Sequence, residues 1–395
     1  MESARFTVGG WGAALRRNGI VEPRQTPPIV SVDDFGARGD GVTDDGEAIA
    51  DALRALDGGG TLVFSPNKTY IKTSLLRVDR PGIKLWGYGA VLYSVVTDGQ
   101  LDEQGAAEVA LHLDAPNTAV YGLTLVSNMR ARVEAHPNLS GIWLSSSDQE
   151  VIDNRLEYAN IFVREATRFA IARNVVYRST FDGIHITTDS SFGAIVGNVV
   201  RQTGDDMIAV VSYGFGEPNV GPVVIDDNDV ADQYWGRGIA VVGGRDVEIR
   251  DNRIARTPFG AGILIHSETS YESSDVRNVV IENNQISEVQ TLSPSYDPVG
   301  GRARAGHGAI DVYGQGDQEV SQVSIARNTI EQSDRDGILV RGLACVVDID
   351  SNQVEGVGRD AIRIEAEPSR ACTIRCRDNS VAARAPLDPL CTAPR

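Results

Sequence analysis

The chain has 395 residues and a formal net charge of −17; 42% of its residues are hydrophobic and 41 are glycine. This balance supports a large core and many turns, which is typical of β-rich folds rather than helical bundles. Acidity without basic runs argues against nucleic acid and anionic membranes as partners, and no run of about 18 apolar residues predicts a transmembrane helix.

The first predicted element follows an N-terminal extension, residues 1–30, whose start contains Glu2 and no continuous apolar stretch, so no signal peptide is expected. The segment TDDGEAIADALRAL predicts a capping helix at about 43–57, with Thr43 as its N-cap. One apolar face of this helix is expected to cover the first coil of the fold that follows. That face consists of Ile49, Ala52, Leu53 and Leu56.

A repeated pair of phrases occupies most of the chain, in coils expected at about 60–382. The first phrase, as in VIDNRL and IARNVV, carries an asparagine, and the second follows it, as in DGIHI and DMIAV. Both alternate apolar and other residues, as strands with one buried face do. A period of mostly 20 to 32 residues predicts a solenoid of parallel strands. The repeated asparagines are Asn154, Asn174, Asn198, Asn228, Asn252, Asn284, Asn328, Asn352 and Asn379.

The predicted fold is all-β, a right-handed parallel β-helix with an N-terminal capping helix, and residues 31–395 are expected to form one domain that ends in a C-terminal tail. The asparagines are expected to stack at one turn of each coil, where they tolerate left-handed backbone angles and bond the next coil. A β-propeller and a stack of hairpins are the alternatives. Both favour Asn-Gly turns, which the repeats lack.

Four cysteines lie late in the chain, at Cys345, Cys372, Cys376 and Cys391. Cys345 and Cys372 each precede a repeated asparagine by seven residues, so they should occupy equivalent positions on adjacent coils. A stack of buried thiols is the favoured interpretation, and a disulfide in an oxidising compartment is the alternative. Cys376 and Cys391 are candidates for tying down the tail.

The segments VDDFGARGDGVTDDGEAIADAL (32–53) and GGGTLVFSPNKTYI (58–71) resemble the N-terminal signature of the pectate-lyase-like β-helix superfamily. That superfamily includes polygalacturonases, polysaccharide lyases, alginate epimerases and phage tailspikes. The resemblance implies the fold rather than the reaction, because this segment caps the helix and carries no chemistry.

The central coils resemble glycoside hydrolase family 28, the polygalacturonase group, over about 90 residues. Three acidic positions match that family: Asp182 in TFDGIHI, and Asp205 and Asp206 in TGDDMIAV. Arg237 stands where the family carries a histidine, and GILIHSE replaces its Arg-Ile-Lys motif. The resemblance therefore implies a hydrolase, while the missing galacturonate-binding motifs make pectin an unexpected substrate.

Alignment of the second phrases places alternate residues on the outer face of one sheet, the expected floor of a groove. One outward column contains Trp143, His185, Ala209, Ala240, Leu264, Asp311, Leu339 and Arg363, and the other contains Ser145, Thr187, Val211, Val242, His266, Tyr313, Arg341 and Glu365. Long loops at 212–221, 266–275 and 287–308 are expected to wall a cleft beside this floor.

Asp182 and Asp206 hold the same register on consecutive coils, with Asp205 beside them. Crowded carboxylates raise the pKa of at least one of them, which gives a proton donor near neutral pH. Asp205 or Asp206 is expected to be the general acid and Asp182 the base that activates water, in an inverting or a retaining mechanism. Asp336 and Asp360 share this register, so turn structure explains one aspartate but not the adjacent pair.

The remaining candidate residues are expected to contact substrate. Arg237 could bond the sugar and keep one aspartate ionised, while Trp143 and Tyr213 could stack on sugar rings. The other predicted substrate contacts are His185, His266, Glu268, His307, Asp311 and Tyr313. The acidic turn 225–232 could bind calcium, but a solvated turn is the favoured interpretation, and no metal or cofactor is predicted.

The predicted function is hydrolysis of a glycosidic bond in a poly- or oligosaccharide other than pectin. The first alternative is a lyase or C5-epimerase acting on a uronate-containing glycan, with His185, Tyr213 or Arg237 as its base. The second is a non-catalytic glycan-binding or tailspike-like module. The family resemblance implies an extracellular or periplasmic location, and a homo-oligomer stays open.

Overall fold

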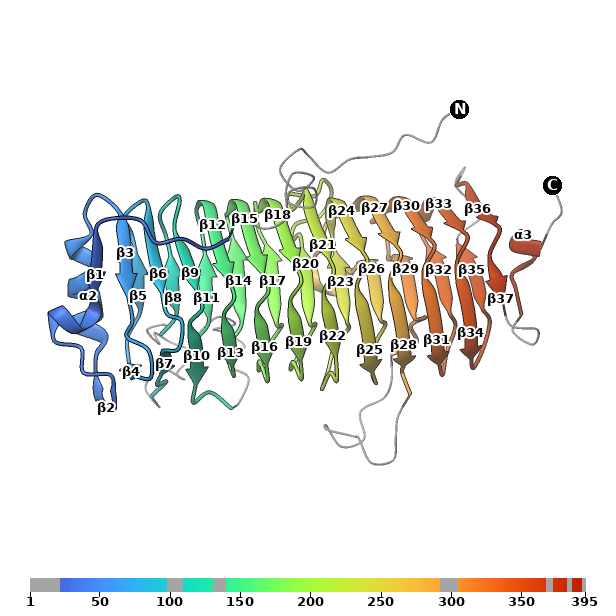
Figure 1. Ribbon diagram of the computed structural model, residues 1–395. Coiled ribbons are helices and arrows are strands. Elements are labelled where there is room, and N and C mark those ends of the chain that lie inside the picture. The colour runs from blue at the N-terminus through green and yellow to red at the C-terminus, as the bar shows by residue number, and fades with distance from the viewer. Residues whose placement is uncertain are drawn as a thin grey trace.

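The computed structural model describes residues 22–97, 109–130, 140–291, 305–366, 372–381 and 386–392. In these parts of the chain, successive strands visit three sheets in turn, and every strand pairs in parallel with the equivalent strand of the next coil (Figure 1). This confirms the predicted solenoid of parallel strands, and the propeller and hairpin alternatives are wrong. No helix among the described residues is long and apolar enough to cross a membrane.

The three sheets are named here sheet A, sheet B and sheet C. Sheet A contains β1 (Ile29–Ser31), β3 (Gly60–Val63), β6 (Ile83–Trp86), β9 (Ala119–Tyr121), β12 (Ser147–Ile152), β15 (Thr167–Ala172), β18 (Ser191–Val196), β21 (Val223–Asp226), β24 (Gly244–Arg250), β27 (Val276–Glu282), β30 (Val320–Ala326), β33 (Ala344–Asp350) and β36 (Ile374–Arg377). Sheet B contains β2 (Asp40–Asp44), β4 (Thr69–Lys72), β7 (Val91–Ser94), β10 (Thr124–Ser127), β13 (Arg155–Glu157), β16 (Val175–Tyr177), β19 (Val199–Arg201), β22 (Asp229–Ala231), β25 (Arg253–Thr257), β28 (Gln285–Val289), β31 (Thr329–Ser333), β34 (Gln353–Val357) and β37 (Ser380–Val381). Sheet C contains β5 (Leu76–Val78), β8 (Leu111–Leu113), β11 (Ile142–Leu144), β14 (Ile161–Arg164), β17 (Ile184–Thr187), β20 (Ile208–Val211), β23 (Ile239–Val242), β26 (Ile263–Ser267), β29 (Ile310–Gly314), β32 (Ile338–Gly342) and β35 (Ile362–Ala366).

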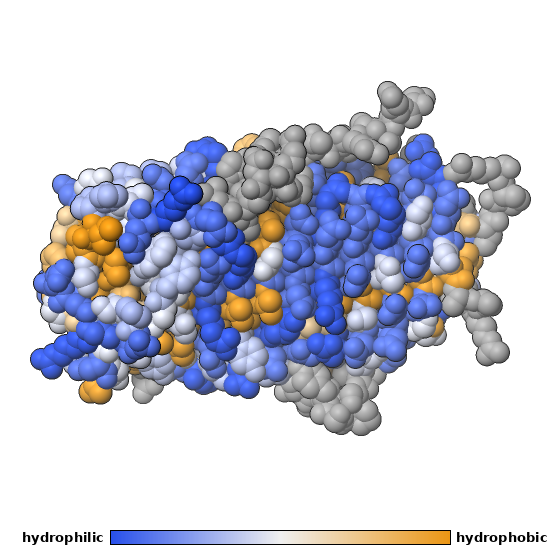
Figure 2. All heavy atoms as spheres, in the orientation of Figure 1, coloured by the Kyte–Doolittle hydropathy of each residue, from blue (hydrophilic) through white to orange (hydrophobic). Residues whose placement is uncertain are grey.

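The core runs along the axis of the helix, because the inward residues of all three sheets are valine, leucine and isoleucine stacked coil upon coil. Hydrophilic side chains dominate the face of the molecule in Figure 2, and apolar ones occur there in scattered groups. The first coil begins at β1, which pairs with β3, so the coils start earlier than the predicted residue 60.

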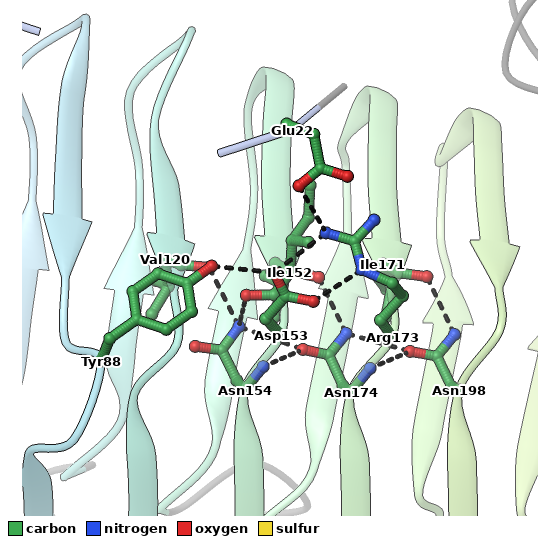
Figure 3. Close-up of polar contacts among 11 residues, drawn as sticks. Glu22, Tyr88, Val120, Ile152, Asp153, Asn154, Ile171, Arg173, Asn174 and Asn198 are labelled. Carbon is green, nitrogen blue, oxygen red and sulfur yellow. Dashed lines mark hydrogen bonds and ion pairs between the residues drawn. The ribbon is translucent and has the colours of Figure 1, made fainter. Parts of the chain in front are cut away.

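The repeated asparagines form one continuous ladder from Asn154 to Asn379. Figure 3 shows its start: the Asn154 N–H donates to Asn174 Oδ1 at 2.9 Å, and the Asn174 N–H donates to Asn198 Oδ1 at 2.9 Å. Each side-chain amide also donates to a carbonyl of the preceding coil, as Asn174 Nδ2 does to Val151 O at 2.8 Å. Removal of one asparagine amide would break hydrogen bonds to both neighbouring coils. Each buried polar group left without a partner costs about 1–3 kcal/mol of stability.

The expected left-handed backbone lies one residue before each asparagine, not at the asparagine itself. Asp153 and Arg173 have φ angles of 61° and 53°, and Gly197 has 65°. The asparagine must stay extended because its N–H donates to the next rung, so its neighbour makes the turn instead.

The N-terminal end is capped by α2 (Gly46–Ala55), which lies at the end of the solenoid in Figure 1, beside the short helix η1 (Val32–Phe35). The predicted apolar face is buried, since Ile49, Ala52 and Leu56 are fully buried and Leu53 is 4% exposed. The predicted N-cap Thr43 is wrong. Thr43 lies in β2, and the helix begins after Asp45, whose carboxylate accepts the N–H groups of residues 38 and 39.

The C-terminal end is closed by two disulfides, Cys345–Cys372 and Cys376–Cys391. The first joins Cys345 in β33 to Cys372, which stands two residues before β36 in the same register, as the spacing predicted, but the favoured interpretation of free buried thiols is wrong. The second ties α3 (Pro389–Thr392) to β36. Small thiols that face each other at one strand spacing are close enough for a covalent bond.

Candidate active site

The outer face of sheet C carries the two columns that the alignment predicted. Strand pairing aligns Trp143, His185, Ala209, Ala240, Leu264, Asp311, Leu339 and Arg363 through consecutive coils. Two further members were missed: His112 and Phe162 belong to the same column. Their strands, LHL and IFVR, lack the Gly-Ile phrase that identified the others, and only the alternation of apolar residues could have revealed them.

These additions complete a row of rings on the N-terminal half of the floor. His112 and Trp143 are stacked with centroids 3.8 Å apart, the Trp143 and Phe162 centroids lie 6.3 Å apart, and those of Phe162 and His185 lie 5.4 Å apart. Flat apolar faces of this kind suit the apolar face of a sugar ring.

A cavity of about 430 Å³ opens at the C-terminal end of this row. It is lined by Phe162, Arg164, Phe181, Asp182, His185, Thr187, Thr188, Asp205, Asp206, Ala209, Val211, Tyr213, Arg237, Val242, Glu268 and Tyr271. The walls come from the turns that precede β17, β20 and β23 and from the predicted loops 212–221 and 266–275. The third predicted wall, 287–308, lies largely outside the described residues.

The three predicted carboxylates meet in this cavity. Oxygen atoms of Asp182, Asp205 and Asp206 all lie within 4.8 Å of one another. Asp206 stands two residues before Ile208, which pairs with Ile184, so it shares the register of Asp182. The predicted register is confirmed, and Asp205 is the additional carboxylate of the adjacent pair.

Gly204 allows the two turns to approach so closely. A Cβ atom at this position would lie within 3.0 Å of the Thr180 carbonyl, in the turn that precedes Asp182. The Gly204 N–H donates to Ser179 O at 2.8 Å, which fixes this distance between the coils.

Asp206 is a buried acid, 4% exposed. Its Oδ1 accepts the backbone N–H of Arg237 at 2.6 Å and lies 3.0 Å from Arg237 Nε. Burial raises the pKa of Asp206 well above its usual value, and the charges of Asp205 and Asp182 raise it further, while Arg237 opposes the shift. Since Oδ1 serves as an acceptor, a proton on this carboxyl group belongs on Oδ2.

Asp182 is paired with a histidine from its own coil. The His185 Nδ1 atom lies 2.5 Å from Asp182 Oδ2, and His185 Nε2 is buried with no hydrogen-bond partner among the described residues. Both side chains line the cavity. This arrangement resembles an acid–histidine pair in which the carboxylate orients the ring.

Arg237 and Glu268 are joined to each other, although both were predicted to contact substrate. Arg237 Nη2 lies 3.6 Å from Glu268 Oε1. Burial opposes ionisation of Glu268, yet the nearby His266 ring and the charge of Arg237 lower its pKa overall. Tyr213 also lines the cavity, and burial raises its pKa to about 12.

The remaining predicted contacts form a second cluster beyond the cavity. His266 and Asp311 are 3% and 0% exposed, and the rings of His307 and Tyr313 pack edge-on to His266 at 5.4 and 5.3 Å. Burial lowers the pKa of His307 to about 3. None of these four lines the cavity, and neither does Trp143, which lies further along the floor.

The acidic turn 225–232 is held by arginines. Arg201 Nη2 lies 2.7 Å from Asp229 Oδ2, and Asp232 is paired with Arg256, whose Nη2 donates to Asp232 Oδ2 at 3.0 Å. The guanidinium groups neutralise the charge that a calcium ion would need, which agrees with the favoured interpretation of a structural turn.

Two family models match the chain: a right-handed β-helix region over residues 140–320, and a rhamnogalacturonase A/epimerase, pectate-lyase-like model over residues 29–110. No curated protein matches the sequence significantly. These matches and the three parallel sheets confirm the predicted right-handed parallel β-helix superfamily. Family 28 in particular stays a prediction.

Solved structures share this fold at low sequence identity. The catalytic unit of a GH87 α-1,3-glucanase from Streptomyces thermodiastaticus is 16% identical with a TM-score of 0.61, over 95% of this chain and 72% of that one. The A-module of the Azotobacter vinelandii mannuronan C-5 epimerase AlgE6 is 18% identical with a TM-score of 0.56, over 89% and 99%. PfbA, a surface adhesin of Streptococcus pneumoniae, is 14% identical with a TM-score of 0.57, over 90% and 91%.

Proposed function

We propose that this chain is a glycoside hydrolase that cleaves a poly- or oligosaccharide in the cavity on sheet C. One observation carries the proposal: a buried carboxyl group, Asp206, lies within 4.8 Å of Asp182 and Asp205 in a cavity with aromatic walls. Burial favours the protonated form of Asp206, as a general acid requires.

The reaction divides between the two sides of the cavity. Asp206 gives the proton on Oδ2 to the glycosidic oxygen as the bond from that oxygen to the anomeric carbon breaks. A water molecule attacks the anomeric carbon, and the Asp182–His185 pair takes up the proton that the water loses. Asp205 supplies negative charge beside the oxocarbenium-like transition state.

The charge of the cavity favours an uncharged sugar over a uronate. Four carboxyl groups line it, against two guanidinium groups, Arg164 and Arg237. Arg237 Nη2 lies 3.6 Å from Glu268 Oε1, and Arg164 Nε lies 3.1 Å from Glu165 Oε1, so both guanidinium groups already have a carboxylate neighbour. A polyuronate would bring further negative charge without a free partner.

A panel of neutral and uronic glycans, assayed for new reducing ends and for absorbance near 235 nm, tests the proposal. We expect reducing ends from a neutral glycan and no absorbance, because hydrolysis forms no double bond. Asp182→Asn should lower the rate about 10²–10⁴-fold, since it removes the base. Full activity in Asp182→Asn would refute the role given to this carboxylate.

The second candidate is a lyase or C5-epimerase on a uronate-containing glycan. The observation in its favour is His185, whose unpartnered Nε2 atom and Asp182 partner suit proton abstraction, while Tyr213 in the same cavity would serve as the acid. A lyase raises the absorbance near 235 nm, and an epimerase exchanges the C5 hydrogen with solvent without cleavage. A non-catalytic adhesion module, as the similarity to PfbA would allow, does neither.

An extracellular or periplasmic location belongs to the same proposal. Two disulfides persist only where thiols are oxidised, and both close the exposed end of the solenoid.

A further inference from the structure

A line of side chains with alternating charge leaves the cavity and crosses the floor towards the C-terminal end. It starts at Asp206 and continues through Arg237, whose Nη2 atom lies 3.6 Å from Glu268 Oε1. Glu268 Oε1 in turn lies 3.7 Å from His266 Nδ1. Each step joins one coil to the next or one strand end to its loop, so the line follows the axis of the helix.

The far end of this line is anchored in the protein interior. His266 Nε2 lies 2.7 Å from Asp311 Oδ1, and Asp311 Oδ2 accepts the Gly308 N–H at 2.8 Å. Arg341 Nε donates to Asp311 Oδ1 at 3.2 Å. Asp311 is fully buried and His266 nearly so, which leaves neither able to touch a substrate in the cavity.

We propose that Glu268, His266 and Asp311 are positioning residues that hold the Arg237 guanidinium between the carboxyl groups of Glu268 and Asp206, so that Arg237 is shared and Asp206 is left with its proton. The catalytic meaning of that proton rests on the proposed function. His266 lies between the two carboxyl groups, with Nε2 2.7 Å from Asp311 Oδ1 and Nδ1 3.7 Å from Glu268 Oε1, which restricts where the Glu268 side chain can lie.

The charged groups around Asp206 explain why Arg237 must be shared with a second carboxyl group. Asp182 faces it from the turn before β17, Asp205 is its neighbour, Arg237 faces it from the turn before β23, and Tyr213 stands beyond β20. Arg237 alone favours the ionised acid, because an opposite charge within about 4–6 Å lowers the pKa of a carboxyl group by 1–3 units.

Glu268 limits this effect of Arg237 in two ways. It shares the guanidinium group, and its own negative charge disfavours a second one at Asp206. Its pKa is lowered overall, although burial opposes this, so Glu268 stays ionised where the enzyme would work. Both effects act in the same direction, which makes the sign of the test definite.

Glu268→Gln tests the proposal, because it removes the charge and keeps the shape. We expect the alkaline limb of the kcat–pH profile to move down by about one pH unit, since Asp206 then ionises earlier. Asp311→Asn should move the alkaline limb in the same direction by a smaller amount, because this substitution weakens the contact that holds His266 and leaves Glu268 charged. Glu272→Gln is the matched control: this carboxylate lies exposed in the same loop and should leave the limb in place.

A second readout needs no substrate. In protein labelled with ¹³C at aspartate carboxyl groups, the Asp206 resonance is assigned by its loss in Asp206→Asn, and its titration is followed in each variant. Titration of Asp206 at an unchanged pH in folded Glu268→Gln would overturn the positioning role. A shifted titration in a protein that hydrolyses no glycan would support that role and reject the proposed function instead.

Discussion

The turn that ends at Asp206 and the turn that ends at Asp336 are built alike. Both aspartates stand two residues before a strand of sheet C, and both are buried, at 4% and 2% exposure. Each Oδ1 accepts the backbone N–H of the equivalent residue in the next coil, Arg237 at 2.6 Å and Asp360 at 3.1 Å. Burial raises the pKa of both carboxyl groups. A buried, protonatable aspartate is therefore a structural element of this solenoid.

The surroundings separate the two turns. Asp206 opens into the cavity and has two carboxylates within 4.8 Å, whereas Asp336 does not line the cavity and has arginine and aspartate side chains of its own turns as charged neighbours. The fold thus offers the same acidic position in several coils. The catalytic arrangement arises where two adjacent coils both carry this aspartate, a third carboxylate stands beside them, and loops enclose all three.

The largest expected difference between the turns is catalytic. Asp206→Asn keeps an oxygen that can accept the Arg237 N–H but removes the proton donor, so we expect the rate to fall about 10²–10⁴-fold. Asp336→Asn keeps the equivalent bond to Asp360 and should retain wild-type activity. Initial rates on the active glycan, with thermal melts to confirm folding, measure both.

Equal losses in the two variants would contradict this distinction, because they would mean that the shared turn bond and not the acid supports activity. Retained activity in Asp206→Asn would reject Asp206 as the general acid.

The fold could be predicted because each coil repeats the same local constraints. Alternation identified the strands, and the asparagine spacing identified the coils, since an amide that bonds two neighbours must recur at every turn. The N-cap prediction failed because it depended on strand pairing. Thr43 lies in β2, which pairs with β4, so the helix begins only after Asp45.

Only the part of the site that depends on strand register could be predicted. Register brought Asp182, Asp206 and Arg237 together, since it follows from strand pairing alone. The pairing of Arg237 with Glu268 depends on side-chain directions and on a loop of free length, which the repeat does not encode. For the same reason His266 and Asp311 were expected in the groove, although they are buried beside it.

A second test uses the glycines that support the two turns. Gly204 packs on the Thr180 carbonyl and Gly358 on the Asp334 carbonyl. A Cβ atom added at either glycine would lie less than 3.0 Å from that carbonyl oxygen. Alanine at either position should cost about 1–3 kcal/mol of stability, because backbone must move apart. Gly204→Ala should also lower activity about 10²-fold, since a shift of about 1 Å misplaces the acid, while Gly358→Ala should not. Similar activities in the two folded variants would argue that the cavity tolerates such movement.

The smallest expected difference lies in the pH dependence of stability. The unfolded chain binds a proton at each aspartate below about its usual pKa of 3.8, whereas the folded chain holds it to higher pH. Between the usual pKa in the unfolded chain and the raised pKa in the folded chain, the folded state binds more protons than the unfolded state, so the stability of the fold falls as the pH rises. Asp206→Asn removes that loss, and its stability relative to the wild type should therefore increase from pH 4 upward until the pH exceeds the folded pKa.

Urea denaturation from pH 4 to 8 measures this trend in the wild type, Asp206→Asn and Asp336→Asn. We expect a larger gain in Asp206→Asn, because the neighbouring carboxylates Asp182 and Asp205 raise the pKa of Asp206 beyond the effect of burial. Asp336→Asn should show a smaller gain, since only one like charge, Asp360, raises the pKa of Asp336, while two arginines, Arg363 and Arg359, lower it. Curves that stay parallel to the wild type would show that neither proton is held by the fold, and the acidic position could then not serve as the origin of the catalytic acid.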